Sequence, residues 1–351
     1  MTDGPNSSTF PGTDWETASP QSVGLDPDGL KRALDYLARE AGGCGVDETV
    51  VIRDGNLVWE GSRTDRVHSI DSGTKTFTTT VLGLLCQDGK LKPGDSIANH
   101  VPAIVDKYPE YADITLAHLG TMTSGYDGER GEPTDERPWG NPEQYLDPAT
   151  PLFPAGSAYK YHDPGVHLLG HILTQVSGQS LADTYRQRIA DAIGMAGWHW
   201  ADYGIVDGIL YNNPSGIYHG GVHISARQMA RHGLLHLNRG NWNGRQLIDS
   251  AWVDLATTNQ VPVSLDTQWF DLRGHYGYMW WTNGVDATGH RPWPSAPDRT
   301  YTSVGASRNY CFVIPEWRMV VVRMEDSTPI RRGRTDTVLD GFFERLGGSL
   351  A

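Results

Sequence analysis

A chain of 351 residues, with 38% hydrophobic and 20% charged side chains, has the composition of a soluble globular protein and the length for one large domain or two that share a core. Its 42 acidic and 29 basic side chains give a net charge of -13, which repels phosphate backbones and anionic membrane faces and argues against a nucleic-acid partner. No apolar run reaches the roughly 18 residues of a membrane span.

The ends and the cysteines of the chain give few signals. Residues 1–14 contain neither a regular pattern nor the basic start and apolar run of a signal peptide, so a cytoplasmic location is predicted unless a signal peptide has been removed. The three cysteines are far apart, and neither CxxC nor HExxH spacing occurs. The sequence therefore predicts no disulfide framework, no metal and no other cofactor.

The first elements predicted along the chain are a helix, a hairpin and a second helix. Asp26 and Pro27 are typical of a helix start, and apolar residues at helical spacing follow as far as Leu37. Two apolar runs flank Asp54-Gly55, a dipeptide that suits a type I′ turn, so a β-hairpin is expected. The second helix should begin near Ser72 and end at Gly89.

The remainder of the chain suggests how these elements combine. Residues 90–215 are rich in Pro, Gly and Asp, with helical segments such as PGVHLLGHILTQVSG between them. ISARQMARHGLLHLN then predicts a helix capped by Ser225, and NYCFVIPEWRMVVVRM predicts two strands before a last helix. The pattern favours an α/β (α+β) fold, in which an antiparallel sheet from both chain termini (15–89 and 216–351) is flanked by helices. Residues 90–215 would form an inserted, mainly helical subdomain.

Ser72-Gly73-Thr74-Lys75 is an S-x-x-K motif at a predicted helix start. Residues three apart share a helical face, so the lysine amine can reach the serine hydroxyl and act as its base if its pKa is lowered. A helix cap for Ser72 and a solvated amine for Lys75 are the simpler interpretation. Ser157-Ala158-Tyr159-Lys160 repeats the motif, but four residues before Pro164, where no regular helix begins at the serine. The sequence therefore favours Ser72 as nucleophile over Ser157.

Five blocks in the same order make the chain similar to class C β-lactamases, penicillin-binding proteins and their esterase and 6-aminohexanoate-dimer hydrolase relatives. They follow the segment SIDSGTKTFTTTVLGLLCQDGKLKPGDSI, which resembles the nucleophile helix of these proteins, and they are ITLAHLGTMTSGYDG, PAGSAYKYHDPGVHLLGHIL, GGVHISARQMARHGLLHLNRGNWNGRQLI, YGYMWW and VGASRNYCFVIPEWRMVVV. The resemblance extends from about residue 15 to 346. It implies a β-lactamase/transpeptidase-like fold and a serine hydrolase that works through an acyl-enzyme on Ser72.

The resemblance places Tyr161 at the tyrosine of the family's Y-x-N motif. In that family the phenol, as a phenolate held by lysine charge, helps take the serine proton and later protonates the leaving group. The asparagine of the motif is Asp163 here, for which two roles stay open. It can cap the helix that continues with Pro164, or it can lie in the substrate site and pair with Lys75, which would raise the pKa of the lysine and make it a poorer base.

The family's K-T-G strand reads Ser303-Val304-Gly305 here. Ser303 and Gly305 are the expected substrate-binding positions, and Gly305 keeps the space that a close backbone approach requires. The resemblance implies an oxyanion hole made by the backbone N–H groups of Ser72 and Ala306. The lysine that receives a β-lactam carboxylate is missing; Arg299 or Arg308 can replace it, although a surface salt bridge is the simpler role for each.

These features predict a hydrolase that cleaves a small ester or linear amide, with Lys75 and Tyr161 as proton-transfer groups. A D-amino-acid peptidase or weak β-lactamase is the alternative within the enzymes, and a non-catalytic scaffold or binding protein is the alternative outside them. Late aromatic residues are expected mainly in the core, with some available to an acyl pocket: Trp269, Tyr276, Trp280, Trp281, Trp293 and Tyr301. The sequence leaves the oligomeric state and the natural substrate open.

Overall fold

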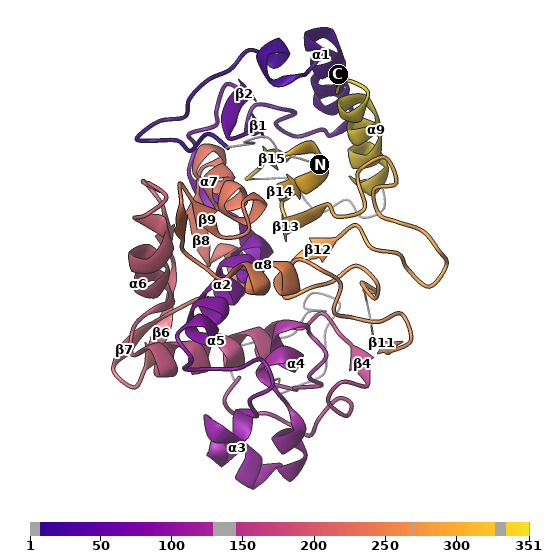
Figure 1. Ribbon diagram of the computed structural model, residues 1–351. Helices are drawn as coiled ribbons and strands as arrows, with labels where there is room; N and C mark the ends of the chain where they lie inside the picture. The colour runs from indigo at the N-terminus through magenta and orange to yellow at the C-terminus, as the bar shows by residue number, and fades with distance from the viewer. Residues whose placement is uncertain (1–7, 129–144, 269, 327–334, 351) are drawn as a thin grey trace, which may run out of the picture.

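The computed structural model describes residues 8–128, 145–268, 270–326 and 335–350. At its centre is a six-stranded antiparallel sheet in the order β12-β13-β14-β15-β1-β2, in which strands from both ends of the chain lie side by side (Figure 1). This is the predicted sheet. Its strands are β1 (Thr49–Arg53), β2 (Asn56–Glu60), β12 (Trp281–Thr282), β13 (Tyr301–Gly305), β14 (Asn309–Ile314) and β15 (Met319–Arg323).

The hairpin between β1 and β2 turns at Asp54-Gly55, as predicted. Both residues have positive φ, 52° and 81°, which is the signature of a type I′ turn. A Cβ on Gly55 would lie 1.7 Å from the carbonyl oxygen of Thr9, so the N-terminal segment also requires glycine here. The second predicted connection, at Pro315, is a short 3₁₀ turn between β14 and β15.

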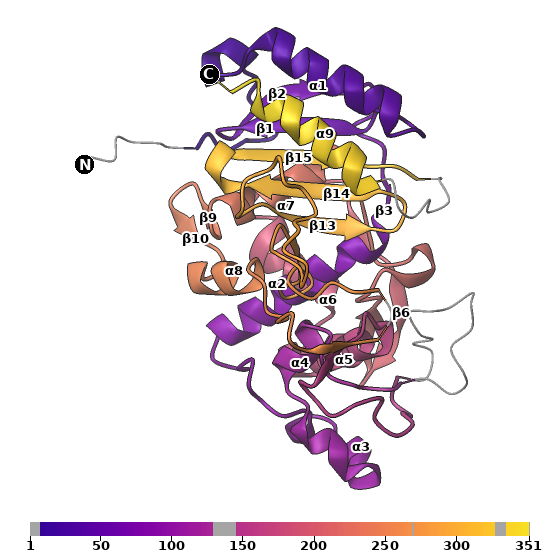
Figure 2. The same cartoon turned by 90° about the vertical axis from the view of Figure 1, so that its right-hand side faces the viewer.

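Helices cover both faces of this sheet. Because side chains alternate along a strand, Val51, Phe312 and Val321 face one cluster of buried residues, and Val50, Val313 and Val320 face the other. The first face packs on α1 (Pro27–Glu40) and α9 (Thr335–Gly347), which lie against each other (Figure 2). The second face packs on α7 (Ala226–Leu237). The side chain of Asp26 caps α1 as predicted, whereas Ser225 precedes α7 without a side-chain cap hydrogen bond.

The helix α2 (Thr74–Gln87) runs through the middle of the molecule (Figures 1 and 2). The sequence predicted one apolar face, but residues 74–85 are buried all round. Burial of its threonines is tolerated because their hydroxyls bond to backbone carbonyls: Thr78 donates to Pro214 at 2.7 Å and Thr79 to Tyr278 at 3.0 Å. The N-terminal end of α2 contacts β13.

The remaining elements lie around α2, and several of them lie on its side away from the large sheet (Figure 1). They comprise the helices α3 (Pro102–Lys107), α4 (Leu116–Gly120), α5 (Asp163–Ser177), α6 (Leu181–Tyr185) and α8 (Ser250–Ala256). Short strands form four small sheets: β3 (His68–Ser69) with β8 (Val222–Ile224) and β5 (His199–Trp200), β6 (Asp202–Val206) with β7 (Ile209–Asn212), β4 (Ala158–Tyr159) with β11 (Asp266–Thr267), and β9 (Asn241–Trp242) with β10 (Arg245–Gln246). Among the described residues, every helix is too short or too polar to cross a bilayer.

Candidate active site

The S-x-x-K motif lies at the start of α2. Ser72 is the middle residue of a 3₁₀ turn, Asp71–Gly73, that leads directly into this helix. Both of its neighbours in the turn are buried, whereas Ser72 is partly exposed and open to a reactant. The Nζ of Lys75 donates to the Oγ of Ser72 at 3.0 Å, so the two side chains share a helical face as the spacing predicts.

Lys75 lies at the centre of a buried polar cluster and is 1% exposed. Its Nζ forms an ion pair with Oδ1 of Asp163 at 2.8 Å and donates to the carbonyl oxygen of Ser215 at 2.8 Å. Burial acts to lower the pKa of Lys75, but the charges and hydrogen bonds of Asp163 and Tyr161 outweigh it and raise the pKa above the usual lysine value. The amine is therefore held as a cation near neutral pH.

Of the two roles left open for Asp163, the structure contains the ion pair. The predicted N-cap role is wrong: α5 begins at Asp163 itself, and the N-cap position belongs to His162, which makes no side-chain cap hydrogen bond. The carboxylate is 3% exposed and points to the ammonium group of Lys75. A buried charge needs a compensating charge, and this requirement outweighs a single capping bond.

Tyr161 lies beside Lys75, two residues before Asp163. The Nζ of Lys75 is 5.1 Å from the centre of its ring, and the tyrosine is 9% exposed. Its ring packs edge-on against Tyr276 and Phe270, with centroids 6.3 Å and 6.1 Å away. The sequence analysis missed Phe270, an exposed aromatic that no motif marks.

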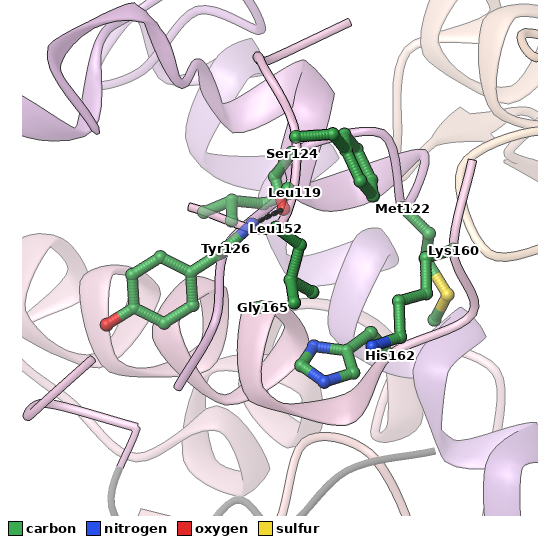
Figure 3. Close-up of a pocket in the computed structure, with 10 residues that line it drawn as sticks. Leu119, Met122, Ser124, Tyr126, Leu152, Lys160, His162 and Gly165 are labelled. Carbon is green, nitrogen blue, oxygen red and sulfur yellow. Dashed lines mark hydrogen bonds between the residues drawn. The ribbon is translucent and has the colours of Figure 1, made fainter. Parts of the chain in front are cut away.

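The alternate residues of this segment face a different environment. Lys160 and His162 line a small pocket together with Leu119, Met122, Ser124 and Gly165 (Figure 3). Tyr161 and Asp163, by contrast, contact Lys75. An extended backbone directs successive side chains to opposite sides, which separates this pocket from the Ser72 cluster.

The second S-x-x-K copy is built differently. Its middle residues form β4, so no helix begins at Ser157, as expected. The hydroxyl of Ser157 donates to the carbonyl oxygen of Pro154 at 2.6 Å, and Lys160 lines the pocket of Figure 3. Since the two residues lie along a strand, they lack the shared helical face that joins Ser72 to Lys75.

The strand β13 brings the third motif to the start of α2. A Cβ on Gly305 would lie 2.1 Å from the carbonyl oxygen of Ile70, so only glycine allows this approach. Ser303 is 1% exposed; its hydroxyl donates to the carbonyl oxygen of Gly73 at 3.1 Å and accepts from Thr76. Ser303 thereby ties β13 to the nucleophile turn, while Ala306 follows the strand with its side chain exposed.

Of the two arginines considered as replacements for the missing lysine, Arg308 has its guanidinium in other surroundings. The guanidinium of Arg308 donates to the carbonyl oxygen of Ala41, at the C-terminal end of α1. This helix covers the face of the sheet opposite to that contacting α7. The backbone N–H of Arg299 donates to Glu316 at 3.3 Å. Arg308 is thus committed to a backbone contact rather than to the predicted salt bridge or the Ser72 site.

A buried histidine behind Lys75 was also missed by the sequence analysis. A hydrogen bond of 3.1 Å joins Nε2 of His167 to the Oγ of Ser215, whose carbonyl accepts from Lys75. Burial, reinforced by the charge of Lys75, holds the pKa of His167 well below its usual value, so the ring is neutral. Its place four residues after Asp163, on the same face of α5, was the available signal.

The late aromatic residues are mainly core residues, as expected. Tyr276, Trp280, Trp293 and Tyr301 are each less than 5% exposed, and Trp281 is partly buried. Trp269 lies outside the described residues. The ring of Phe270 is 5.5 Å from that of Trp281, so these two and Tyr161 form a connected aromatic group. In the described ranges, no group of three or more His, Cys, Asp or Glu side chains is placed to hold a metal ion.

Comparison with known proteins assigns the family. A family model described as Beta-lactamase matches residues 38–340, most of the chain. The chain belongs to the beta-lactamase family of serine hydrolases, as the motifs around Ser72 and Tyr161 predicted. A β-lactamase of Pseudomonas fluorescens is 31% identical over 127 residues, which are 36% of this chain and 34% of that protein. The 6-aminohexanoate-dimer hydrolase of Paenarthrobacter ureafaciens is 21% identical over 291 residues, 77% of this chain and 72% of that protein.

Solved structures support the same fold. A class C β-lactamase from Rhodobacter sphaeroides aligns with a TM-score of 0.61 at 17% identity, covering 92% of this chain and 100% of that chain. EstCE1, described as a hydrolase with promiscuous acyltransferase activity, aligns with a TM-score of 0.67 at 16% identity, covering 91% and 98%. At this level of identity the structures establish the fold, and the chemistry has to be argued from the site of this chain.

Proposed function

We propose that the protein hydrolyses an ester or a linear amide through an acyl-enzyme on Ser72. The observation that carries the proposal is the contact of the Lys75 ammonium with both the Ser72 hydroxyl, at 3.0 Å, and the Asp163 carboxylate, at 2.8 Å. A serine whose hydroxyl faces a buried cation beside a second proton-transfer group is an activated nucleophile. A helix start alone would not require a serine, a buried lysine and a buried aspartate in contact with one another.

In the first half of the reaction, Ser72 Oγ attacks the carbonyl carbon of the substrate. The proton of Ser72 passes to the phenolate oxygen of Tyr161, which becomes a neutral phenol. The carbonyl π electrons move to the carbonyl oxygen, whose negative charge the N–H groups of Ser72 and Ala306 stabilise. The bond to the alcohol or amine then breaks, and Tyr161 returns the proton to the leaving group. Lys75 remains a cation throughout, because Asp163 raises its pKa, and stabilises the negative charge that develops beside it.

In the second half, water attacks the acyl carbon of the Ser72 ester. Its proton passes to the Tyr161 oxygen and from there to Ser72 Oγ as the carboxylic acid leaves. Protons and electron pairs balance over the cycle without a cofactor. Lys75 thus acts in this scheme as a charge rather than as the base that the S-x-x-K motif alone suggests.

The choice of ester or linear amide over a β-lactam rests on the third motif. Ser303 stands at the position of the family's lysine and is engaged with Gly73 and Thr76, and Arg308 contacts Ala41 instead. A substrate carboxylate would therefore lack that cation. The name of one similar protein, a 6-aminohexanoate-dimer hydrolase, favours a linear amide, and EstCE1 is described as a hydrolase with acyltransferase activity.

A substrate panel tests the proposal. Wild-type protein and Ser72→Ala are assayed with p-nitrophenyl esters of increasing acyl length, a linear 6-aminohexanoate amide, a peptide ending in two D-alanines and nitrocefin. We expect ester or linear-amide turnover that falls at least about 10³-fold in Ser72→Ala, as removal of a serine nucleophile does elsewhere. Ser157→Ala serves as the matched control and should keep the activity.

Two results would contradict this function. Rapid nitrocefin or D-alanyl peptide turnover with negligible ester and amide cleavage would favour the peptidase or β-lactamase alternative. Absence of Ser72-dependent turnover of any substrate in the panel would favour a scaffold or binding protein on the same fold.

A further inference from the structure

The residue directly before the nucleophile, Asp71, adopts an unusual backbone conformation. Its φ is +48°, in the left-handed region that residues other than glycine, asparagine and aspartate rarely adopt. Its N–H donates to the Oγ of Ser69 at 3.1 Å, which helps to hold this conformation. Asp71 is 5% exposed, so a charged residue has been buried at a position where glycine would fit without strain.

The side chain of Asp71 reaches the turn that follows β13. Its Oδ2 accepts the backbone N–H of Ser307 at 3.1 Å, a contact between residues 236 positions apart in the sequence. This turn is closed by a bond of 3.1 Å from the N–H of Arg308 to the carbonyl oxygen of Gly305. Ser307 is buried, whereas Ala306, just before it, is exposed at the site.

We propose that Asp71 is a positioning residue for the oxyanion hole, a role that rests on the hydrolase function proposed above. By fixing the N–H of Ser307, its carboxylate orients the adjoining peptide plane and so aims the N–H of Ala306. Its left-handed backbone sets the direction of the next N–H, that of Ser72. One residue thereby aligns both donors on the same point, through its side-chain oxygen and its backbone conformation.

Two substitutions separate the acceptor from the other properties of Asp71. Asp71→Gly keeps the positive φ at no steric cost and removes the acceptor. Asp71→Asn tolerates the same φ and retains an oxygen that can accept from Ser307, but it removes the charge. Because both variants suit the backbone, both are expected to fold, which far-UV circular dichroism and the melting temperature check.

The readout is the ratio of kcat/KM for a p-nitrophenyl ester to that for its thionoester, in which sulfur replaces the carbonyl oxygen. Sulfur is a weak hydrogen-bond acceptor, so an aligned oxyanion hole favours the oxygen substrate. The leaving group and the nucleophile are the same for both substrates. General damage to the site therefore lowers both rates, whereas misalignment of the donors lowers the ratio.

In Asp71→Gly we expect the ester kcat/KM to fall about 10²-fold, mainly in kcat, and the ester-to-thionoester ratio to fall about tenfold, since one misplaced oxyanion donor has effects of this size. Asp71→Asn should keep the wild-type ratio. An unchanged ratio in an active Asp71→Gly, or an equal fall of the ratio in both variants, would overturn the role of Asp71 alone. Lack of Ser72-dependent ester hydrolysis in the wild type would overturn the proposed function and this role together.

Discussion

At the scale of single residues, the pairing of Lys75 with Asp163 distinguishes this site from the asparagine-containing motif that the chain resembles. The carboxylate and the ammonium are both almost fully buried and 2.8 Å apart, and this pairing helps to hold the pKa of Lys75 above its usual value. In the proposed scheme, proton transfer falls to Tyr161, whose ring centre is 5.1 Å from the ammonium nitrogen. The aspartate in place of the family's asparagine would make this scheme depend more on the tyrosine than on the lysine.

This assignment predicts the pH dependence of Asp163→Asn. Removing the carboxylate leaves burial as the main influence on Lys75, so its pKa should fall. Because the scheme needs Lys75 as a cation, the alkaline limb of kcat/KM should move to lower pH by the same amount. Rates measured from pH 6 to 11, with surface Asp191→Asn as control, test this. An alkaline limb that stays in place or moves upward would contradict the role of Lys75.

The residues that sequence reasoning could identify are those with local signals. The spacing of Ser72 and Lys75 is a helical one, and the motif resemblance located Tyr161 and Asp163. The contacts that complete the site join distant positions: Ser215 lies 140 residues from Lys75, and Ser307 lies 236 residues from Asp71. Such pairs follow from the tertiary fold, so no local pattern could have predicted them.

At the scale of elements, the proposed activity should depend on how closely β13 approaches the turn that carries Ser72. The start of α1 and the Asp54-Gly55 hairpin were predictable because caps and turns have local chemistry. The burial of α2 on all sides was not predictable, because its threonines resemble a polar face in the sequence. Only the structure shows that their hydroxyls bond to backbone carbonyls. The close approach of β13 was expected from Gly305, but the distance of the strand from the nucleophile turn could be determined only from the structure.

Substitution of Gly305 tests the approach. In Gly305→Ala the new Cβ would meet the carbonyl oxygen of Ile70 at 2.1 Å, so the strand or the nucleophile turn must move. A displacement of about 1 Å between reacting groups typically costs about 10²-fold in rate, and we expect a fall in kcat/KM of at least this size. Gly94→Ala is the matched control, because a Cβ there meets nothing within 4 Å. Full activity in Gly305→Ala would show that β13 does not position the site.

At the scale of the whole molecule, the core contains histidines that are buried in neutral form. Burial lowers the pKa of His167 and His232 well below the usual value and that of His236 to about 4. His232 is stacked on Phe77, with ring centres 4.1 Å apart, directly beside α2. The unfolded chain would protonate these rings near pH 6.5, whereas the folded chain would not.

The free energy of unfolding should therefore decrease as the pH falls below about 6.5, the unfolded pKa of histidine, and continue to decrease toward the lowered folded values. Each ring that stays neutral in the folded state contributes a loss of about 2 kcal/mol between pH 7 and pH 5. Urea unfolding at a series of pH values measures the slope. His236→Gln should reduce it by about one proton, and exposed His199→Gln should not. A wild-type curve that is flat over this range would contradict the neutral burial of these histidines.

The central claim, that Ser72 is the nucleophile, is tested most directly by covalent labelling with a fluorophosphonate, read by intact mass and by mapping of the modified peptide. The account predicts one adduct on Ser72 in the folded wild type, the same adduct in Ser157→Ala and none in Ser72→Ala. An unlabelled wild type, or an adduct that persists in Ser72→Ala, would contradict it.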